Sequence, residues 1–478
     1  MSDLEHRLAA LEAAVAQQDV TIAERDATIA EHVATIAKLE KRVAELETKL
    51  GQNSSNSSLP PSTDRGQNSH RNAKKGAKRK KRKKRPGGGR HRELLPPEQV
   101  DAFHDHFPTA CGGCGKRLPK TSDAEPQRHQ VTEIPEVRPH VDEHRLHAVE
   151  CRCGSVTRAE LPDDVPRGAF GPRLIATVAL LTGLYRLSKR NTQRILSELF
   201  GVTISTGAVS NCERRVGDAL EAPHQELHRF VQAREVLHAD ETSWQQEHRT
   251  HWLWVACTCT VSFFLIQAGR CTDGAKRLLG AFDGTLVIDR LASYGFRAGP
   301  QQTCWAHLKR MFQGLADRTD GDCAKYGVPL LENTRKMFKL WRRVRDGTLQ
   351  HRTFQRRMIP IRAEIEGLLD EAAESPYTRT QGKAKALLKY RDALWTFVDV
   401  EGIPPTNNEA ERALRHAVIL RKLSFGTQSD RGSRFIERML SAVDTLRKQD
   451  RDVMDFLMDA LAAKATTATP PSLLPTTA

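Results

Sequence analysis

Long apolar runs are missing from the sequence: none approaches the roughly 20 residues that a membrane-spanning helix needs. The first residues are polar and of helical type, so a secretion signal is not expected either. The ten cysteines therefore do not predict a secreted, disulfide-bonded protein. We expect a cytoplasmic protein with reduced thiols and no membrane partner, in which the following are core thiols: Cys212, Cys257, Cys259, Cys271, Cys304 and Cys323.

Acidic residues are absent from residues 71–92, where 13 lysines and arginines lie close together. The whole chain carries a formal charge of +15, so all other residues together contribute only +2. So dense a cationic run predicts a disordered arm that binds DNA phosphates without regard to base sequence. A solvated linker is the alternative. The predicted DNA-binding residues of the arm are Lys74, Lys75, Lys78, Arg79, Lys80, Lys81, Arg82, Lys83, Lys84 and Arg85.

A seven-residue repeat precedes the arm, and Thr-Ile-Ala recurs in it at residues 21–23, 28–30 and 35–37. The repeat places β-branched residues at position a and leucines at position d, which is typical of a parallel two-stranded coiled coil over residues 1–50. Polar residues interrupt the middle d positions, which lowers stability but can fix the register. We expect a homodimer or higher oligomer through this segment; pairing with another protein and a solvated single helix are the alternatives.

The remaining four cysteines form two close pairs, Cys111 with Cys114 and Cys151 with Cys153, and each pair is followed by glycine. With β-like sequence at residues 131–149 between them, the pairs are typical of a zinc ribbon, in which four thiolates hold one tetrahedral Zn²⁺. The second pair is one residue shorter than the usual spacing. A histidine could therefore replace a cysteine ligand, the candidates being His129, His140, His144 and His147. A metal-free pair of β-turns is the alternative.

A helical block follows, with helices predicted at residues 172–184, 188–200 and 205 to about 230. Ser188 and Ser205 are the expected N-caps. The layout resembles a helix-turn-helix whose last helix presents Arg214 and Arg215 to DNA. An ordinary helical bundle that supports the next domain is the alternative.

Two aspartates end apolar runs of strand type, Asp240 after residues 236–239 and Asp289 after residues 285–288. Two β-rich runs and a helix lie between them, and a further short strand follows; these are residues 251–258, 261–267, 273–282 and 302–305. The order resembles that of the ribonuclease-H fold, a mixed five-stranded sheet with helices, which carries metal-binding aspartates on its first and fourth strands. For each aspartate alone, a residue that merely starts a turn is the alternative.

A third carboxylate, Glu411, lies in a predicted helix far along the chain, beyond a helical insertion at residues 313–400. Two strand-end aspartates and a helical glutamate can hold a pair of Mg²⁺ ions, which prefer carboxylate oxygens and leave positions open for phosphate and water. The structural alternative makes Asn408 an N-cap, Glu411 its capping-box partner and Arg415 an ion-pair partner.

The motifs of the chain resemble those of the insertion sequence 66 family of bacterial DDE transposases, and the resemblance covers nearly the whole chain. Leu291, where the family more often has tyrosine, and Leu59, where lysine is usual, depart from the pattern. The matching segments are 50–64 (LGQNSSNSSLPPSTD), 238–242 (HADET), 304–310 (CWAHLKR) and 407–415 (NNEAERALR), followed by Arg421-Lys422 and Phe425-Gly426.

The resemblance implies the catalytic and metal-binding roles of Asp240, Asp289 and Glu411, with Asp240 bridging two Mg²⁺ or Mn²⁺ ions. It implies phosphoryl transfer that frees 3′ hydroxyls at the element ends and joins them to a target duplex. Phosphate-contacting or orienting roles fall to His307, Lys309 and Arg412. Expected partners are DNA at the nucleoid and accessory proteins of the same element. The alternatives are a nuclease or resolvase of this fold without strand transfer and a noncatalytic, transposase-derived DNA-binding regulator.

The predicted organisation is that of an α/β protein with a ribonuclease-H-like core, which a helical insertion interrupts. The predicted parts are a coiled coil (1–50), a disordered linker (51–95), a zinc-ribbon-like module (96–158), the helical block (165–232), the first part of the core (233–312), the insertion (313–400), the Glu411 helix (401–426), two C-terminal helices (427–465) and a disordered tail (466–478).

Overall fold

The computed structural model describes residues 3–50, 52, 56, 93–121, 125–162, 165–289 and 292–475. The basic arm predicted at residues 71–92, Leu59 and Leu291 lie outside the described residues. Contacts divide the chain into two units, one formed by Met1–Gly66, His144–Gln193 and Ile204–Ala478, the other by Gln67–Glu143 and Arg194–Thr203. No helix in the described ranges combines the length and apolar character needed to cross a membrane.

A mixed five-stranded sheet lies in the first unit, with strand order β5-β4-β3-β6-β7. Its first three strands form the predicted antiparallel meander, and the last two run parallel to β3. Positive φ angles of 50° and 64° at Glu247 and His248 allow the tight β3–β4 turn. The strands are β3 (Val236–Gln246), β4 (Arg249–Cys257), β5 (Ser262–Gln267), β6 (Thr285–Ile288) and β7 (Gln301–Thr303).

Helix α6 (Thr272–Leu279) connects β5 to β6 and buries Ala275, Leu278 and Leu279. Gly274 lets this helix approach β4, since a Cβ at that position would lie 2.8 Å from the Trp254 ring. The short 3₁₀ helix η4 (Ala292–Tyr294) then packs beside α6 before β7 begins. These elements confirm the predicted order of strands and helix, although β3 extends six residues beyond Asp240.

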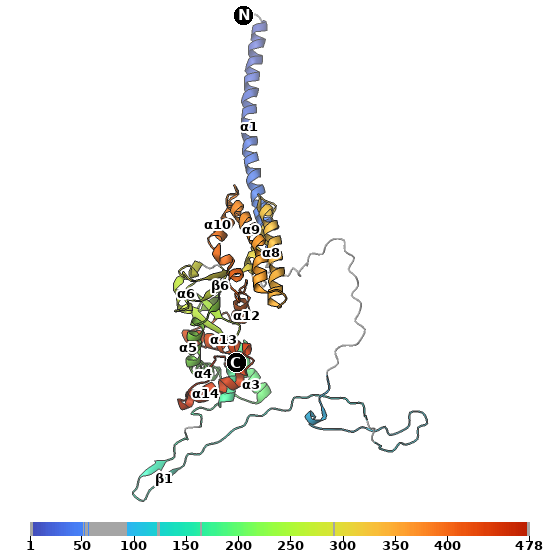
Figure 1. Cartoon of the computed structure of the whole chain (residues 1–478), viewed down its shortest axis with the longest axis vertical. Coiled ribbons are helices and arrows are strands. Elements are labelled where there is room, and N and C mark those ends of the chain that lie inside the picture. The colour runs from blue at the N-terminus through green and yellow to red at the C-terminus, as the bar shows by residue number, and fades with distance from the viewer. Residues whose placement is uncertain are drawn as a thin grey trace. The chain divides into compact units, whose positions relative to one another are not determined.

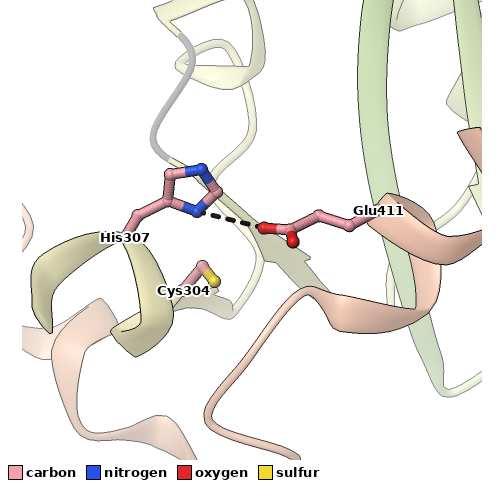
Figure 2. Close-up of side chains that lie close together, drawn as sticks. All are labelled: Cys304, His307 and Glu411. Carbon is pink, nitrogen blue, oxygen red and sulfur yellow. Dashed lines mark ion pairs between the residues drawn. The ribbon is translucent and has the colours of Figure 1, made fainter. Parts of the chain in front are cut away.

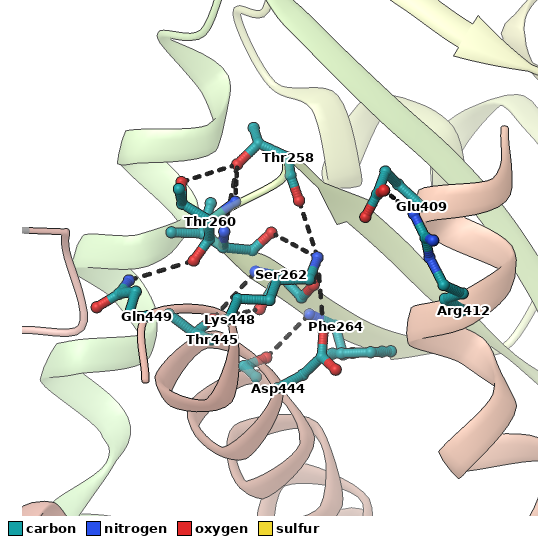
Figure 3. A network of polar contacts seen from close by, with 12 residues as sticks. Thr258, Thr260, Ser262, Phe264, Glu409, Arg412, Asp444, Thr445, Lys448 and Gln449 are labelled. Atoms are coloured by element: carbon teal, nitrogen blue, oxygen red, sulfur yellow. Dashed lines mark hydrogen bonds and ion pairs between the residues drawn. The ribbon is translucent and has the colours of Figure 1, made fainter. Parts of the chain in front are cut away.

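Strand β5 is at the edge of the sheet, and helix α13 (Asp430–Lys448) covers this edge with side-chain hydrogen bonds, as Figure 3 shows. The β5 amides of Ser262 and Phe264 donate to Thr445 Oγ1 and Ser441 Oγ at 3.0 and 2.9 Å. The Ile266 amide donates to Glu437 Oε1 at 2.5 Å. Because the three acceptors recur every four residues, one face of α13 replaces the missing neighbouring strand.

Burial raises the pKa of Glu437 from 4.5 to about 7, although the Ile266 amide and two arginines oppose the shift. The folded protein therefore keeps a proton that the unfolded chain releases. This contribution to stability is fully present below pH 4.5 and is lost as the pH rises through about 7, with a magnitude on the order of 3 kcal/mol. Glu437→Gln should remove this part of the pH dependence.

Thermal midpoints measured from pH 5 to pH 8 test this prediction. As the pH rises, the thermal midpoint of wild type should fall relative to that of Glu437→Gln, because only the wild-type protein has the Glu437 carboxyl group that loses its proton. The exposed Glu401→Gln serves as the matched control and should follow the wild-type profile. Parallel profiles for wild type and Glu437→Gln would contradict the assignment.

A helical region separates β7 from the Glu411 helix and has its own core, in which Trp305, Trp395, Phe397 and Phe354 pack together. Figure 1 shows α8 and α9 side by side, in orange. The predicted helical insertion is thus present. Its elements are α7 (Trp305–Ala316), α8 (Cys323–Arg345), α9 (His351–Ala373), α10 (Thr378–Leu388), η5 (Asp392–Leu394) and α11 (Thr396–Asp399).

Helices before the sheet follow the prediction except at one break. Ser188 and Ser205 cap their helices, accepting from the amides of Asn191 and Ala208 at 3.1 Å. The predicted helix from residue 205 to about 230 is wrong as one element, because it breaks at Leu220. The helices are α2 (Pro172–Ala179), the π-helical turn η3 (Leu180–Leu184), α3 (Lys189–Phe200), α4 (Thr206–Ala219) and α5 (Glu221–Gln232).

The C-terminal region contains α14 (Val453–Thr466), which Asp452 caps. The prediction of a disordered tail is wrong for residues 467–475. Leu473 is buried, and its carbonyl accepts from Gln449 Nε2 at 2.9 Å. Arg451 donates to the carbonyl of Ser472 at 2.9 Å. The composition of the tail predicted disorder, but one apolar residue, Leu473, fixes the tail to the C-terminal helices.

The N-terminal residues form one long helix, α1 (Asp3–Leu50). Farther on, η2 (Pro97–Gln99) and a short antiparallel hairpin of β1 (Ala148–Glu150) and β2 (Val156–Arg158) are the regular elements described between residues 93 and 162. The β-like sequence at residues 131–147 forms no strand there, so that prediction is wrong over most of its length. Isolated from a sheet, β-forming residues lack the cross-strand neighbours that would stabilise them.

Candidate functional site

Asp240 lies within β3, and Asp289 directly follows Ile288, the last residue of the neighbouring parallel strand β6. His238 of β3 pairs with Val287 of β6, so extending this register by two residues brings Asp240 and Asp289 to the same level. Burial is the main cause that raises the pKa of Asp240 well above its usual range, and the negative charges of Asp289, Glu241 and Glu411 add to it. The sheet therefore brings negatively charged side chains close together.

Glu411 reaches this region from α12 (Asn408–Ser424). The structural alternative, a capping box from Asn408 to Glu411, is not present, because the N-cap residue is Asn407 and its side chain makes no capping bond. Glu411 consequently lies one position later in the helix than a capping box requires. Its carboxylate faces α7 instead of the helix start, and the basic side chains that contact it are His307 and Arg310, at 3.5 and 3.6 Å from Oε1.

His307 links the carboxylates from the first turn of α7. Its Nδ1 lies 3.5 Å from Glu411 Oε1 and its Nε2 lies 4.0 Å from Asp289 Oδ2. Figure 2 shows His307 and Glu411 facing each other, with the Cys304 thiol below the imidazole. Within the described residues, the one group of three metal-ligand side chains with ligand atoms all within 4.8 Å is Cys304, His307 and Glu411.

The Cys304 thiol is a poor member of a metal site. Burial raises its pKa to about 11, so it stays protonated at neutral pH, and it already accepts the Asn407 amide at 3.2 Å. The predicted core role of Cys304 fits this geometry, as it does for the buried Cys212, Cys257 and Cys323. The same prediction is wrong for Cys259 and Cys271, which are exposed because they lie in surface turns at the ends of β4 and β5.

Asn407 joins the Glu411 helix to the Asp240 strand, a role that the sequence did not suggest. Its fully buried side chain donates to the Ala239 carbonyl at 2.8 Å and accepts from His238 Nδ1 at 3.1 Å. Burial lowers the pKa of His238 to about 4, which keeps the imidazole neutral and suited to this bond. The start of α12 is thereby fixed beside the first half of β3, directly before Asp240.

Glu241 is a second buried acid next to Asp240, which the sequence analysis did not place in the site. Its Oε1 accepts two bonds from Arg270, at 2.9 and 2.7 Å. Burial, and to a smaller degree Asp289, raises the pKa of Glu241 to about 7, while Arg270 opposes the shift. Arg270 also lies over the Trp252 ring, so the pair braces β3 against the loop before α6. The signal available in the sequence was the acidic residue that directly follows Asp240.

The other predicted helpers differ in their surroundings. Arg412 is exposed and pairs with Glu409 one turn earlier on α12, away from the acids. Lys309 lies on α7 with its ammonium 5.9 Å from the centre of the Phe338 ring. Arg310, the last residue of the 304–310 motif, was not predicted to have a role of its own. It contacts Glu411 directly and is therefore a better candidate for phosphate binding than Lys309 or Arg412.

The donor set fits a divalent cation. Glu411 Oε1 is buried and accepts no hydrogen bond among the described residues. Burial first, and then repulsion by the charges of Asp289, Glu241 and Glu411, raises the pKa of Asp240. A hard cation would satisfy the unbonded oxygen and cancel the repulsion, and carboxylates are the ligands that Mg²⁺ and Mn²⁺ prefer.

Each predicted zinc pair lies in a tight turn. The Gly115 amide donates to the Cys111 carbonyl and the Gly154 amide to the Cys151 carbonyl, at 2.9 and 2.8 Å. Amide groups directed at the sulfur lower the thiol pKa of Cys111 and Cys151, the largest causes being the amides of Gly113 and Cys153. Both turns therefore favour thiolates, and the shared zinc site stays a prediction that zinc analysis of the purified chain tests.

The predicted DNA-reading arginines lie on α4. Arg214 is exposed and pairs with Asp218 on the same helix at 3.4 Å, while Arg215 is half-buried. Within the described part of the chain, neither arginine forms an ion pair with Asp289 or Glu411. Their role in DNA binding stays a prediction.

Comparison with known proteins places the chain. Residues 167–435 match the family model described as Transposase IS66 family, which spans more than half of the chain and contains all three acids. Residues 13–93 match a second model, a family of unknown function (DUF6444). Two similar proteins come from Sinorhizobium fredii (strain NBRC 101917 / NGR234).

The first is the uncharacterized protein y4hP, 26% identical over 393 residues, which cover 74% of this chain and 70% of the relative. The second is the uncharacterized protein y4qI, 27% identical over 220 residues, or 41% of this chain and 39% of the relative.

Proposed function

The chain belongs to the IS66 family of transposases, and we propose that it cuts and joins DNA by divalent-metal-dependent phosphoryl transfer at Asp240, Asp289 and Glu411. The observation that carries the proposal is the approach of all three acids. Asp240 lies opposite Asp289 on the sheet, and Glu411 is held beside them through His307 and the Asn407 bonds. The strand order supports a ribonuclease-H-like core.

Asp240, Asp289 and Glu411 would hold the divalent cations that the proposed reaction needs. Magnesium or manganese bound there would activate water and neutralise charge that develops on phosphate. His307 would keep the Asp289 and Glu411 carboxylates in position, and Arg310 would bind the phosphate that approaches Glu411. Asn407 and the Glu241–Arg270 pair would fix the backbone that carries the acids.

The proposed reaction consists of two successive displacements. Water attacks a phosphodiester at the element end and leaves a free 3′ hydroxyl. That 3′ oxygen then attacks a phosphodiester of the target duplex in line, forming one bond while the target's own 3′ oxygen departs with a proton. The basic arm, through its lysine and arginine run, would hold both duplexes in a salt-dependent, sequence-independent way.

A strand-transfer assay tests the proposal. Purified chain, a labelled duplex carrying the element end, and a circular target should give a joined product in Mg²⁺ and none in EDTA. Nicked ends without any joined product would instead identify a nuclease or resolvase. Binding without cleavage would identify a regulator that retains only the DNA-contacting parts.

We further propose that α1 forms the coiled coil through which the chain dimerises. Apolar residues of the heptad pattern are exposed along the helix, from 45% at Leu46 to 64% at Leu11. Burying such a row in a second copy is strongly favourable. The chain should therefore have about twice its monomer mass of 53.5 kDa in solution.

Light scattering after gel filtration measures the mass. Ile29→Asp places a charge in the apolar row and should give a monomer, or shift the dimer constant by at least about tenfold. Ala30→Asp adds the same charge one position outside the row and should leave the dimer intact. Equal masses for the two variants would contradict pairing through this face.

A further inference from the structure

A hollow of about 350 Å³ opens next to Arg310, the α7 side chain that contacts Glu411. Helix α7 lines it with Lys309, Arg310 and Gln313, helix α8 adds Phe338, and Thr406 and Asn408 close it at the start of α12. The hollow borders the proposed catalytic site because Arg310 also lies 3.6 Å from Glu411. Its volume is at the small end of ligand sites, which run from about 300 to 1,000 Å³.

The lining combines positive charge, an aromatic face and neutral hydrogen-bonding groups. Lys309 and Phe338 lie together, with 5.9 Å between the ammonium and the ring centre. Arg310 Nε is buried and donates no hydrogen bond among the described residues. A different nitrogen of the same guanidinium, Nη2, contacts Glu411 Oε1 at 3.6 Å, which is longer than a hydrogen bond. A buried guanidinium nitrogen without an acceptor is costly, so an acceptor from a ligand would stabilise this arrangement.

We propose that the hollow binds one unstacked nucleotide of the DNA strand, next to the phosphate that is cut. The base lies against Phe338, and its 5′ or 3′ phosphate lies between Lys309 and Arg310. Gln313, Thr406 and Asn408 offer amide and hydroxyl groups to the base edge or sugar. This inference rests on the proposed function and adds a specific subsite to it.

The chemistry favours a single nucleotide over an intact duplex. In a duplex each base is already stacked on its neighbours and cannot present a face to Phe338, whereas an unpaired base at a strand end costs little to unstack. Aromatic stacking supplies about 1–3 kcal/mol per base, and the two cations bind the adjoining phosphate. Holding that nucleotide would also keep the neighbouring phosphodiester beside Glu411.

Base unstacking can be measured without cleavage. The probe is the element-end duplex with 2-aminopurine placed in turn at each nucleotide around the cut, mixed with the full chain in Ca²⁺. One position should brighten on binding to wild type. Phe338→Leu keeps an apolar side chain but loses the aromatic face, so the brightening should disappear, while Phe338→Tyr should retain it.

The charge arm of the experiment compares two substitutions. Lys309→Gln should weaken binding of a duplex with an unpaired terminal nucleotide by roughly 10- to 150-fold, because it removes a charged hydrogen-bond donor from the phosphate. Arg357→Gln removes a positive charge from an exposed position on α9, outside the hollow, and should not weaken this preference for the unpaired end. Brightening that is absent in wild type, or equal in Phe338→Leu, overturns the subsite.

The two proposals fail in different ways. Asp240→Asn leaves the hollow intact, so it should show the wild-type fluorescence change even though it cannot cut. If wild type does not cut the DNA in Mg²⁺ but the fluorescence change is present and depends on Phe338, the catalytic proposal fails and the subsite stands. If wild type cuts the DNA but shows no fluorescence change that depends on Phe338, the subsite proposal fails and the catalytic proposal stands.

Discussion

Asp240→Asn is expected to abolish cleavage and joining, by at least about 10³-fold, while DNA binding is unchanged. The substitution keeps the size of the side chain but removes a negative charge that would hold the divalent cations. Loss of one preorganised charge-stabilising group costs about 10²- to 10³-fold, and loss of a carboxylate ligand of the cations should cost more. Gel-based cleavage in Mg²⁺ and fluorescence anisotropy for DNA binding measure the two effects separately.

The same variant has a second readout, thermal unfolding with and without Mg²⁺. Asp240 is half-buried beside Asp289, Glu241 and Glu411, whose charges repel it. Mg²⁺ should therefore raise the unfolding temperature of wild type and have little effect on Asp240→Asn. Asp273→Asn, the same substitution at an exposed position on α6, is the control and should behave as wild type. Cleavage by Asp240→Asn would remove the basis of the assignment.

Asn407→Ala is expected to have the next largest effect. It leaves the Ala239 carbonyl without its 2.8 Å donor and His238 Nδ1 without its acceptor, both in the interior. Each unsatisfied buried group costs about 1–3 kcal/mol, so the free energy of unfolding should fall by roughly 2–4 kcal/mol. Since the same side chain fixes the start of α12, misplacement of Glu411 should also slow cleavage by roughly 10²-fold.

Urea unfolding and initial cleavage rates, measured below the unfolding transition, test both parts. Asn191→Ala removes an exposed amide from α3 and is the control, with less than about 0.5 kcal/mol of change expected. An Asn407→Ala chain with wild-type stability and rate would show that its two bonds do not hold the helix to the strand.

The strand pattern of the core was predictable because its signals are local. Asp240 and Asp289 follow short apolar runs. A short apolar run bounded by turn residues is typical of a buried strand. The meander between them has tight turns and continuous β-forming residues. The distance of 122 residues from Asp289 to Glu411 likewise required an insertion, and its helical periodicity was clear.

What the sequence missed depends on contacts between distant residues. Asn407 and Asn408 are identical in type, and a capping rule chose Asn408; only the bonds from Asn407 to β3 distinguish them. The α13 side chains that cover β5 accept hydrogen bonds from amides that lie 171 to 183 residues away in the sequence. No periodicity in one chain reports such pairings. Leu473 anchors a tail of disorder-prone composition for the same reason.

The most direct test of the three-acid site compares Glu411→Gln with Glu409→Gln in the strand-transfer assay. Both substitutions remove one negative charge from the first turn of α12, but only Glu411 faces His307 and Arg310, whereas Glu409 pairs with the exposed Arg412. We predict that Glu411→Gln forms no cleaved or joined product in Mg²⁺ and that Glu409→Gln forms both. Wild-type product from Glu411→Gln, or equal loss in both variants, would contradict the three-carboxylate site.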